Sequence, residues 1–404
     1  VYPGESYNDA KFKSLLHFLT VQIRRYLAFA EMEQDTQQQQ LYLCQALRKR
    51  NIDSAFEKSW NKLARQRARP SIQNAHSHYQ NYQLQLERYT FFHRARRTER
   101  FHLQELTESL TTFYVAEMLR QTCIMISARN MAAEGYEVVG LAQVLQQAAH
   151  PKLEQQAAVA IYHQAYLMLT ETEAQHHERL ADLLEIHRHC FPTDELRDIY
   201  LLAINYCIKR LNQGDRAYIR EAFNWYQKGL AQRILFENGI LSPYTYYNAL
   251  MLSIGLEEWD WGGQFLDDYR QHLPPTERQN SYTYSRAVYS FRKGDYSTAM
   301  GLLQQVTFKD ELYNLNARSM LLRMYYELCE WDALDALLDS FTSYIRRQKR
   351  LGYHRENYLN LIRFTRQLLR LAPTQSAGRK QLIQRIEETK SLAEKDWLLA
   401  QTRM

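Results

Sequence analysis

The sequence predicts an all-α protein, and three observations lead to this fold class. Glycine and proline are scarce, at 13 and 8 of 404 residues, whereas all-β proteins and long loops need more turn residues. Apolar residues recur at intervals of three and four along most of the chain, as on one face of a helix. The prolines and several glycines fall between these periodic segments, where they separate one helix from the next.

The first region, residues 1–133, is predicted to contain long helices. Asn8 or Asp9 is the predicted N-cap of the first helix, and its apolar residues at positions 12, 15, 16, 19, 23, 26 and 27 form one stripe. Asp35, Ser71 and Thr98 are candidate N-caps of later helices. The five helices are predicted at about 9–33, from 36 through Leu47, and at about 54–69, 72–97 and 99–130.

The second region, residues 134–378, is predicted to be an array of shorter helices. Phe191-Pro192-Thr193 separates two of them, with Thr193 as candidate N-cap, and Ser242-Pro243 is a cap followed by a first-turn proline. Helices are predicted at about 137–148, 152–169, 173–190, 194–212, 215–237, 243–254, 257–272, in two hairpins over 282–347, and at 353–371.

The third region, residues 379–404, is predicted to be one closing helix at about 380–401. Its apolar stripe includes Leu382, Ile386, Trp397 and Leu398. A helix that covers the exposed end of a stack is expected in a repeat array.

Two consecutive hairpins within 282–347 suggest what the repeating unit is. The turn Gly294-Asp295-Tyr296 is followed by Ala299, and markers at the start of each second helix (Arg216, Trp259, Tyr296, Trp331) are 43, 37 and 35 residues apart. The last two intervals are close to the 34-residue period of tetratricopeptide repeats. The hairpin that contains Gly294 resembles this family, whose turn is Gly-Asp-Tyr-x-x-Ala.

This resemblance implies a right-handed α-solenoid of stacked antiparallel helix hairpins, tetratricopeptide-like in the C-terminal half. It is strong over 282–340, weak over 194–281 and only periodic before that. Cys329-Glu330-Trp331 departs from the family turn, as does Glu258-Trp259-Asp260, and the family's proline at the end of each repeat is missing. The resemblance does not identify a ligand.

Charge is distributed unevenly along the chain. Residues 41–100 carry 13 Lys and Arg against 4 Asp and Glu, a net +9, and residues 341–370 carry 8 against 1, a net +7. Arginine pairs with phosphates and carboxylates, and interleaved aromatic residues can stack on bases. Alternatively, each segment is a solvated helix face over an aromatic core. The candidate partner-binding residues are Arg65, Arg69, Arg94, Arg97, Arg346, Arg347, Arg350, Arg363 and Arg366.

Residues that would support catalysis or metal binding are few. The sequence contains no phosphate-binding glycine loop, no Gly-x-Ser-x-Gly and no His-Glu-x-x-His. His176 and His177 precede His187 and Cys190, but nothing in the sequence brings the first pair to the second, so we expect no metal site. We also expect no cofactor. The five cysteines are scattered along the sequence, so we expect free thiols in a reducing cytoplasm rather than a disulfide framework.

The hypothesis favoured by these observations is a cytoplasmic, non-catalytic scaffold that binds a peptide or a partner protein on a solenoid surface. A minority of the 29 tyrosines could line a peptide groove, although the sequence does not select them. The first alternative is an RNA or other nucleic-acid binder that uses segments 41–100 and 341–370. The second is an enzyme with an unrecognised site. We expect no membrane span, because no apolar run approaches the length of about 18 residues that a span needs. The oligomeric state is left open.

Overall fold

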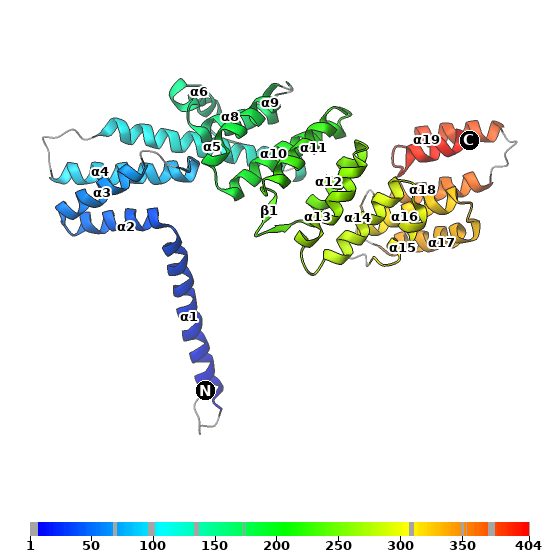
Figure 1. The fold of residues 1–404 in the computed structure, drawn as a ribbon, viewed down its shortest axis with the longest axis horizontal. Coiled ribbons are helices and arrows are strands. Elements are labelled where there is room, and N and C mark those ends of the chain that lie inside the picture. The colour runs from blue at the N-terminus through cyan, green and yellow to red at the C-terminus, as the bar shows by residue number, and fades with distance from the viewer. Residues whose placement is uncertain are drawn as a thin grey trace. The chain divides into compact units, whose positions relative to one another are not determined.

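The computed structural model describes residues 7–67, 71–95, 102–132, 137–171, 173, 175–306, 311–348, 351–352, 354–370 and 376–403. It is an all-α protein in which helices pack mainly against their neighbours in the sequence, as in an α-solenoid (Figure 1). The chain forms two compact units, residues 1–235 and 236–404. Among the described residues, no helix combines the length and apolarity needed to cross a bilayer.

Unit 1 contains eleven described α-helices and one 3-10 helix. The helices are α1 (Asp9–Gln34), α2 (Thr36–Lys49), α3 (Asp53–Arg67), α4 (Ala75–Ala95), α5 (Leu103–Ala132), α6 (Leu141–Ala148), α7 (Pro151–Glu154), α8 (Ala157–Thr170), α9 (Gln175–His187), η1 (Arg188–Cys190), α10 (Thr193–Asn212) and α11 (Tyr218–Ala231). Helices α2 with α3, α4 with α5, α8 with α9 and α10 with α11 form packed pairs.

Unit 2 begins with a short hairpin and continues as helix pairs. Its elements are β1 (Phe236–Glu237), β2 (Ile240–Leu241), α12 (Pro243–Gly255), α13 (Trp259–Tyr269), η2 (Arg270–His272), α14 (Arg278–Arg292), α15 (Tyr296–Leu303), α16 (Glu311–Glu327), α17 (Trp331–Arg347), α18 (His354–Arg370), α19 (Ser376–Glu388) and α20 (Lys395–Arg403). The pairs are α12 with α13, α14 with α15, and α16 with α17. One apolar core extends from Leu315 in α16 to Leu398 in α20.

The turns inside the three hairpins of unit 2 share one backbone geometry. Glu257, Gly294 and Cys329 all have positive φ, at 59°, 86° and 59°, and each lies two residues before the second helix of its hairpin. The next amide always donates to the carbonyl five residues back, over 2.8 to 2.9 Å. This 6→1 bond belongs to the Schellman motif, which ends helices on a left-handed residue. The three hairpins therefore repeat in structure although Gly294 is not repeated in sequence.

Several predicted caps are observed, and others differ. The N–H groups of Lys11, Gln38 and Thr245 donate to the side chains of Asn8, Asp35 and Ser242. Asn74 rather than Ser71 caps α4, since Asn74 Oδ1 accepts from the N–H of Ser77 at 2.9 Å. Thr193 lies inside α10, whose N-cap is Pro192. Thr98 lies outside the described residues.

The helix predicted at 215–237 is wrong at its end, because α11 stops at Ala231 and a hairpin follows. Phe236 pairs with Leu241 and Glu237 with Ile240. Asn238 and Gly239 between the strands have φ of 51° and 79°. An Asn-Gly pair with positive φ at both residues is typical of a type I′ turn, so the local signal was present in the sequence.

The closing helix predicted at 380–401 is also wrong, because it is divided into α19 and α20. The connection is held by α18, where the amide of Asn360 donates to Ser391 O at 2.7 Å and Asn357 O accepts from Ala393 N at 3.2 Å. These contacts join residues that are distant in sequence. The predicted domain limits after residues 133 and 378 stay predictions.

Candidate functional site

A groove in unit 2 is the candidate functional site. It has a volume of about 630 Å³ and is lined by α12, by the segment that leads into α14, by α14, by the residues after α15, and by α16. Helices α12, α14 and α16 are the first helices of the three hairpins. The groove, called the tyrosine groove below, is lined by Pro243, Tyr244, Tyr247, Thr276, Glu277, Gln279, Asn280, Ser281, Tyr284, Ser285, Gln305, Val306 and Tyr313.

Three tyrosine rings form the wall of this groove, one from each first helix. The ring centroids of Tyr247 and Tyr284 are 5.7 Å apart, those of Tyr284 and Tyr313 4.8 Å, and those of Tyr247 and Tyr313 5.8 Å. Tyr284 is buried, whereas Tyr247 and Tyr313 are half-buried. The rings therefore hold the stacked helices together and still present part of their surface to a ligand.

The start of α12 places a fourth tyrosine at the rim. The side chain of Ser242 accepts from the N–H of Thr245 at 3.0 Å, and Pro243 occupies the first turn. Tyr244 and Tyr247 then lie three residues apart on one face of the helix. Tyr244 is 65% exposed, so its ring is available to a ligand.

The described lining of the tyrosine groove carries little charge. Burial raises the pKa of Tyr247 and of Tyr284, so both hydroxyls are protonated at neutral pH and can donate a hydrogen bond. Among the described residues that line the groove, Glu277 is the one with a formal charge. Rings, hydroxyls and amides suit an extended peptide, whereas a phosphate or nucleic-acid site would need arginine or lysine.

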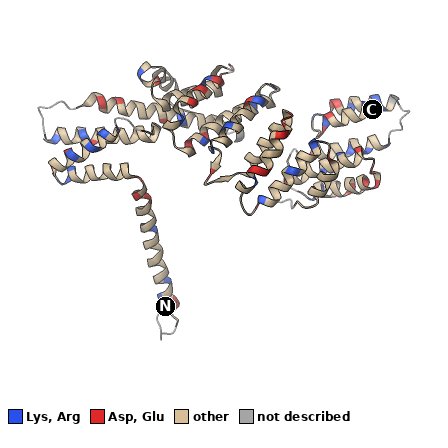
Figure 2. Cartoon of the chain, in the orientation of Figure 1, with Lys and Arg blue, Asp and Glu red and all other residues tan. Residues whose placement is uncertain are grey.

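The described members of the first set of sequence-predicted arginines, Arg65 and Arg94, lie on α3 and α4 of unit 1 (Figure 2). Arg65 is exposed on α3. Arg94 is engaged within the protein, because its guanidinium donates to Arg48 O at 2.9 Å, to the side chain of Asn51, and to Asp53 Oδ1 at 2.7 Å. Arg69 and Arg97 lie outside the described residues.

The aromatic residues of the same segment differ in burial, because Phe56 and Phe91 are buried and Trp60 and Phe92 pack against them, whereas Tyr42 and Tyr79 are exposed. The Phe56 and Phe91 rings stack with centroids 4.3 Å apart, and both side chains are buried. Arg88 lies 4.5 Å above the ring of Trp60, and Arg48 pairs with Glu87. These contacts agree with the interpretation of a solvated helix face over an aromatic core.

The described members of the second set of arginines lie in unit 2, on α17 and α18. Arg346, Arg347 and Arg363 are exposed, and Arg363 lies 4.7 Å above the ring of Phe364. Arg366 forms an ion pair with Asp339 at 2.5 Å. Arg350 is outside the described residues. None of these described arginines lines the tyrosine groove.

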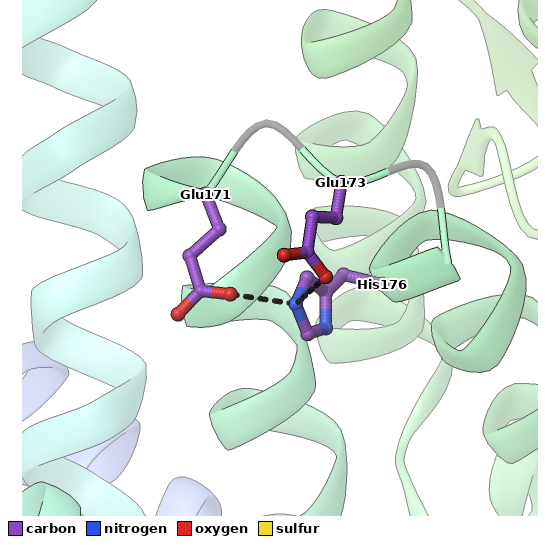
Figure 3. Close-up of side chains that lie close together, drawn as sticks. All are labelled: Glu171, Glu173 and His176. Atoms are coloured by element: carbon purple, nitrogen blue, oxygen red, sulfur yellow. Dashed lines mark hydrogen bonds and ion pairs between the residues drawn. The ribbon is translucent and has the colours of Figure 1, made fainter.

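His176 forms a polar cluster with Glu171 and Glu173, in which one potential ligand atom from each lies within 4.8 Å of the others (Figure 3). The distance from His176 Nε2 to Glu171 Oε2 is 2.7 Å. Gln164 Nε2 is 2.9 Å from His176 Nδ1 and donates to His176 O at 3.0 Å. The carbonyl contact sets the orientation of the amide, so its NH2 group faces Nδ1 and favours the tautomer with the ring proton on Nε2.

This tautomer opposes metal binding. A metal at Nε2 would move the ring proton to Nδ1, against the NH2 group of Gln164. The proton on Nε2 instead points to Glu171. We therefore interpret the cluster as a hydrogen-bonded link between the end of α8 and the start of α9.

His177, the next residue, belongs to a different environment. It is buried, its Nε2 accepts from Trp225 Nε1 at 2.7 Å, and Cys207 Sγ lies 3.4 Å from the same nitrogen. Burial raises the pKa of Cys207 to about 12 and lowers that of His177. Because Trp225 occupies the lone pair of His177, the two residues are not arranged as a nucleophile and its base.

The structure does not bring the predicted histidine and cysteine residues together. His176 faces two glutamates, His177 faces Trp225, and Cys190 is buried beside His189. The sequence did not single out the tyrosines of the groove, because they come together only when three helices stack. Comparison of the chain with protein-family models, with curated proteins and with solved structures finds no significant match.

Proposed function

We propose that the chain is a non-catalytic interaction scaffold, built of tetratricopeptide-like hairpins, that binds an extended peptide segment of a partner protein in the tyrosine groove. The observation that carries this proposal is the groove itself, to which three successive first helices each contribute a tyrosine. Its volume of about 630 Å³ lies within the range of about 300–1,000 Å³ that is typical of ligand sites.

The lining indicates the chemistry of the peptide. Tyrosine faces pack well against proline and aromatic side chains, and the hydroxyl of Ser281 offers a polar group for the peptide backbone. The Gln279 amide is already held by Arg270 and Thr283. Glu277 would favour a basic residue at its end of the groove. We therefore expect an extended segment with a proline or aromatic anchor, and with a lysine or arginine beside it.

Peptide display on the immobilised chain, followed by calorimetry of the selected peptides, tests this function. We expect Tyr244→Ala to weaken binding by about tenfold or more, as aromatic anchors at interfaces do. Tyr42→Ala is the matched control, because Tyr42 is an exposed tyrosine on α2 and lies outside the groove. Failure to select any peptide, or equal affinity of the Tyr244→Ala variant, would refute the proposal.

Nucleic-acid binding is the second candidate, and the exposure of Arg65, Arg346, Arg347 and Arg363 favours it. A labelled single-stranded RNA should then bind with an affinity that falls steeply with salt, through counterion release. Replacing Arg346 and Arg347 together by glutamine should reduce that slope. An absence of binding at low salt would exclude this candidate.

A further inference from the structure

A second groove lies in unit 1, between the first half of α5 and the segment that runs from the end of α6 through α7 to the start of α8. It has a volume of about 980 Å³, at the upper end of the range of about 300–1,000 Å³ that is typical of ligand sites. Its described lining, called the glutamine groove below, consists of five glutamines, three threonines of α5, Glu108, His150, Lys152 and Leu153. Leu153 is the one apolar side chain among them, so the groove suits a polar ligand.

The α5 side of the glutamine groove presents mainly hydrogen-bond acceptors. Each of its threonine hydroxyls donates to the backbone carbonyl four residues earlier, at 2.8, 3.0 and 2.9 Å for Thr107, Thr111 and Thr112. A hydroxyl has one proton, so only lone pairs of these three oxygens remain for a ligand. Glu108 Oε1 accepts from Gln104 Nε2 at 2.9 Å and from Lys152 Nζ at 3.2 Å, and a carboxylate likewise offers a ligand only acceptors. A ligand on this side therefore has to donate.

The opposite side of the groove offers amides and a ring N–H. The glutamines whose side chains form no hydrogen bond within the described part of the chain are Gln146, Gln147, Gln155 and Gln156. Each of these amides can both donate and accept. His150 Nδ1 accepts from the N–H of Lys152 at 3.3 Å, as the cap of α7, so the proton of the neutral ring is on Nε2. This side can therefore donate to the same ligand groups that donate to α5.

The charges of the described lining balance. Glu108 and Lys152 form an ion pair at 3.2 Å, with side chains 47% and 75% exposed. The carboxylate and the threonine lone pairs would repel an anionic ligand, and Lys152 alone would attract it. A cationic ligand would meet Lys152 in turn. The groove therefore suits a ligand without charge.

We propose that the glutamine groove binds a neutral oligosaccharide. A sugar hydroxyl can donate its proton to a threonine oxygen of α5 while its own oxygen accepts from a glutamine amide across the groove. An extended peptide fits less well, because both of its edges carry carbonyls as well as N–H groups. Carbonyls that face the threonines would lose their hydrogen bonds to water without replacement, which is costly. This site belongs to unit 1, so it is separate from the tyrosine groove of unit 2.

An oligosaccharide array probed with the whole, fluorescently labelled chain tests this proposal, followed by calorimetry of the best ligand. The array carries cellotriose, maltotriose and chitotriose as neutral probes, heparin fragments as anionic ones, and extended peptides. We expect at least one neutral oligosaccharide to bind, with an affinity that does not change with salt because no counterions are released.

Two matched variants locate the site. Thr111→Val removes an acceptor and keeps the shape of the side chain, so it should weaken binding about fivefold, the effect of one hydrogen bond. Thr90→Val is the control, because Thr90 on α4 donates to Leu86 O at 2.8 Å in the same way and does not belong to the described lining. Circular dichroism should show that both variants fold.

Three outcomes would overturn the proposal. The first is that no neutral oligosaccharide binds. The second is that the two valine variants bind the selected oligosaccharide with equal affinity, which would place its site elsewhere. The third is that only heparin fragments or only peptides bind, which would assign the groove to another class of ligand.

Discussion

The repeated left-handed turn predicts opposite effects for two substitutions at equivalent positions. Gly294 has φ of 86°, and a Cβ added there would have no heavy atom within 4 Å, so the cost of Gly294→Ala is conformational. The left-handed conformation costs a residue with a Cβ about 1–2 kcal/mol. The added Cβ also restricts the unfolded chain, which stabilises the folded state by about 0.4–1 kcal/mol. We therefore expect the free energy of unfolding to fall by about 1 kcal/mol. Cys329→Gly, at φ of 59°, should stabilise its hairpin by a similar amount.

Hydrogen exchange with mass spectrometry suits this test, because it resolves the stability of α14 to α17 from the rest of the chain. A change of 1 kcal/mol alters exchange by about fivefold. Gly301→Ala is the control, since Gly301 lies inside α15, has open space around it and does not have a left-handed φ. There the same substitution should stabilise by about 0.5–1 kcal/mol.

Equal effects of Gly294→Ala and Gly301→Ala would refute the reasoning, because they would mean that the turn does not impose its backbone geometry. Destabilisation by Cys329→Gly would refute it independently. It would show that the Cys329 side chain contributes more than its backbone strain costs.

Three further predictions concern single side chains. Burial lowers the pKa of His78 to about 4, whereas the ordinary pKa of histidine is 6.5. Unfolding therefore takes up a proton at pH values below 6.5. The contribution of His78 to the stability of unit 1 should be constant above that pH and should fall towards pH 4 by up to about 1.4 kcal/mol per pH unit. Denaturant titrations at several pH values measure this slope, and His78→Gln should reduce it. Arg94→Gln should lower the unfolding free energy of unit 1 by less than about 1 kcal/mol, whereas Arg65→Gln should leave it unchanged in the same titrations. Ser242→Ala removes the cap of α12 and should cost about 1 kcal/mol, seen as faster exchange of the Thr245 amide.

Much of the fold follows from local signals in the sequence. Asn8, Asp35 and Ser242 cap the helices that they were predicted to cap, because a cap depends on residues two or three positions away. The break between α19 and α20 depends instead on hydrogen bonds from α18. A sequence pattern cannot show such contacts, since their two sides are separated by about thirty residues.

The candidate site was less predictable than the fold. Composition shows that arginines are concentrated in two segments, but not that Arg94 and Arg366 are paired with Asp53 and Asp339. In the same way, 29 tyrosines are evident in the sequence, but their grouping into one wall requires three helices to stack. The uneven distribution of charge was the signal that the sequence showed, whereas the described residues that line the groove are largely uncharged.

The distribution of the thiols has a practical consequence. Cys44, Cys123, Cys190 and Cys207 are buried, and burial raises the pKa of each, whereas Cys329 is exposed. A maleimide dye added to the unmodified protein should therefore attach at one known position, on the turn between α16 and α17. The chain thus carries its own reporter in unit 2, and fluorescence from it can follow opening of that hairpin without any engineered residue.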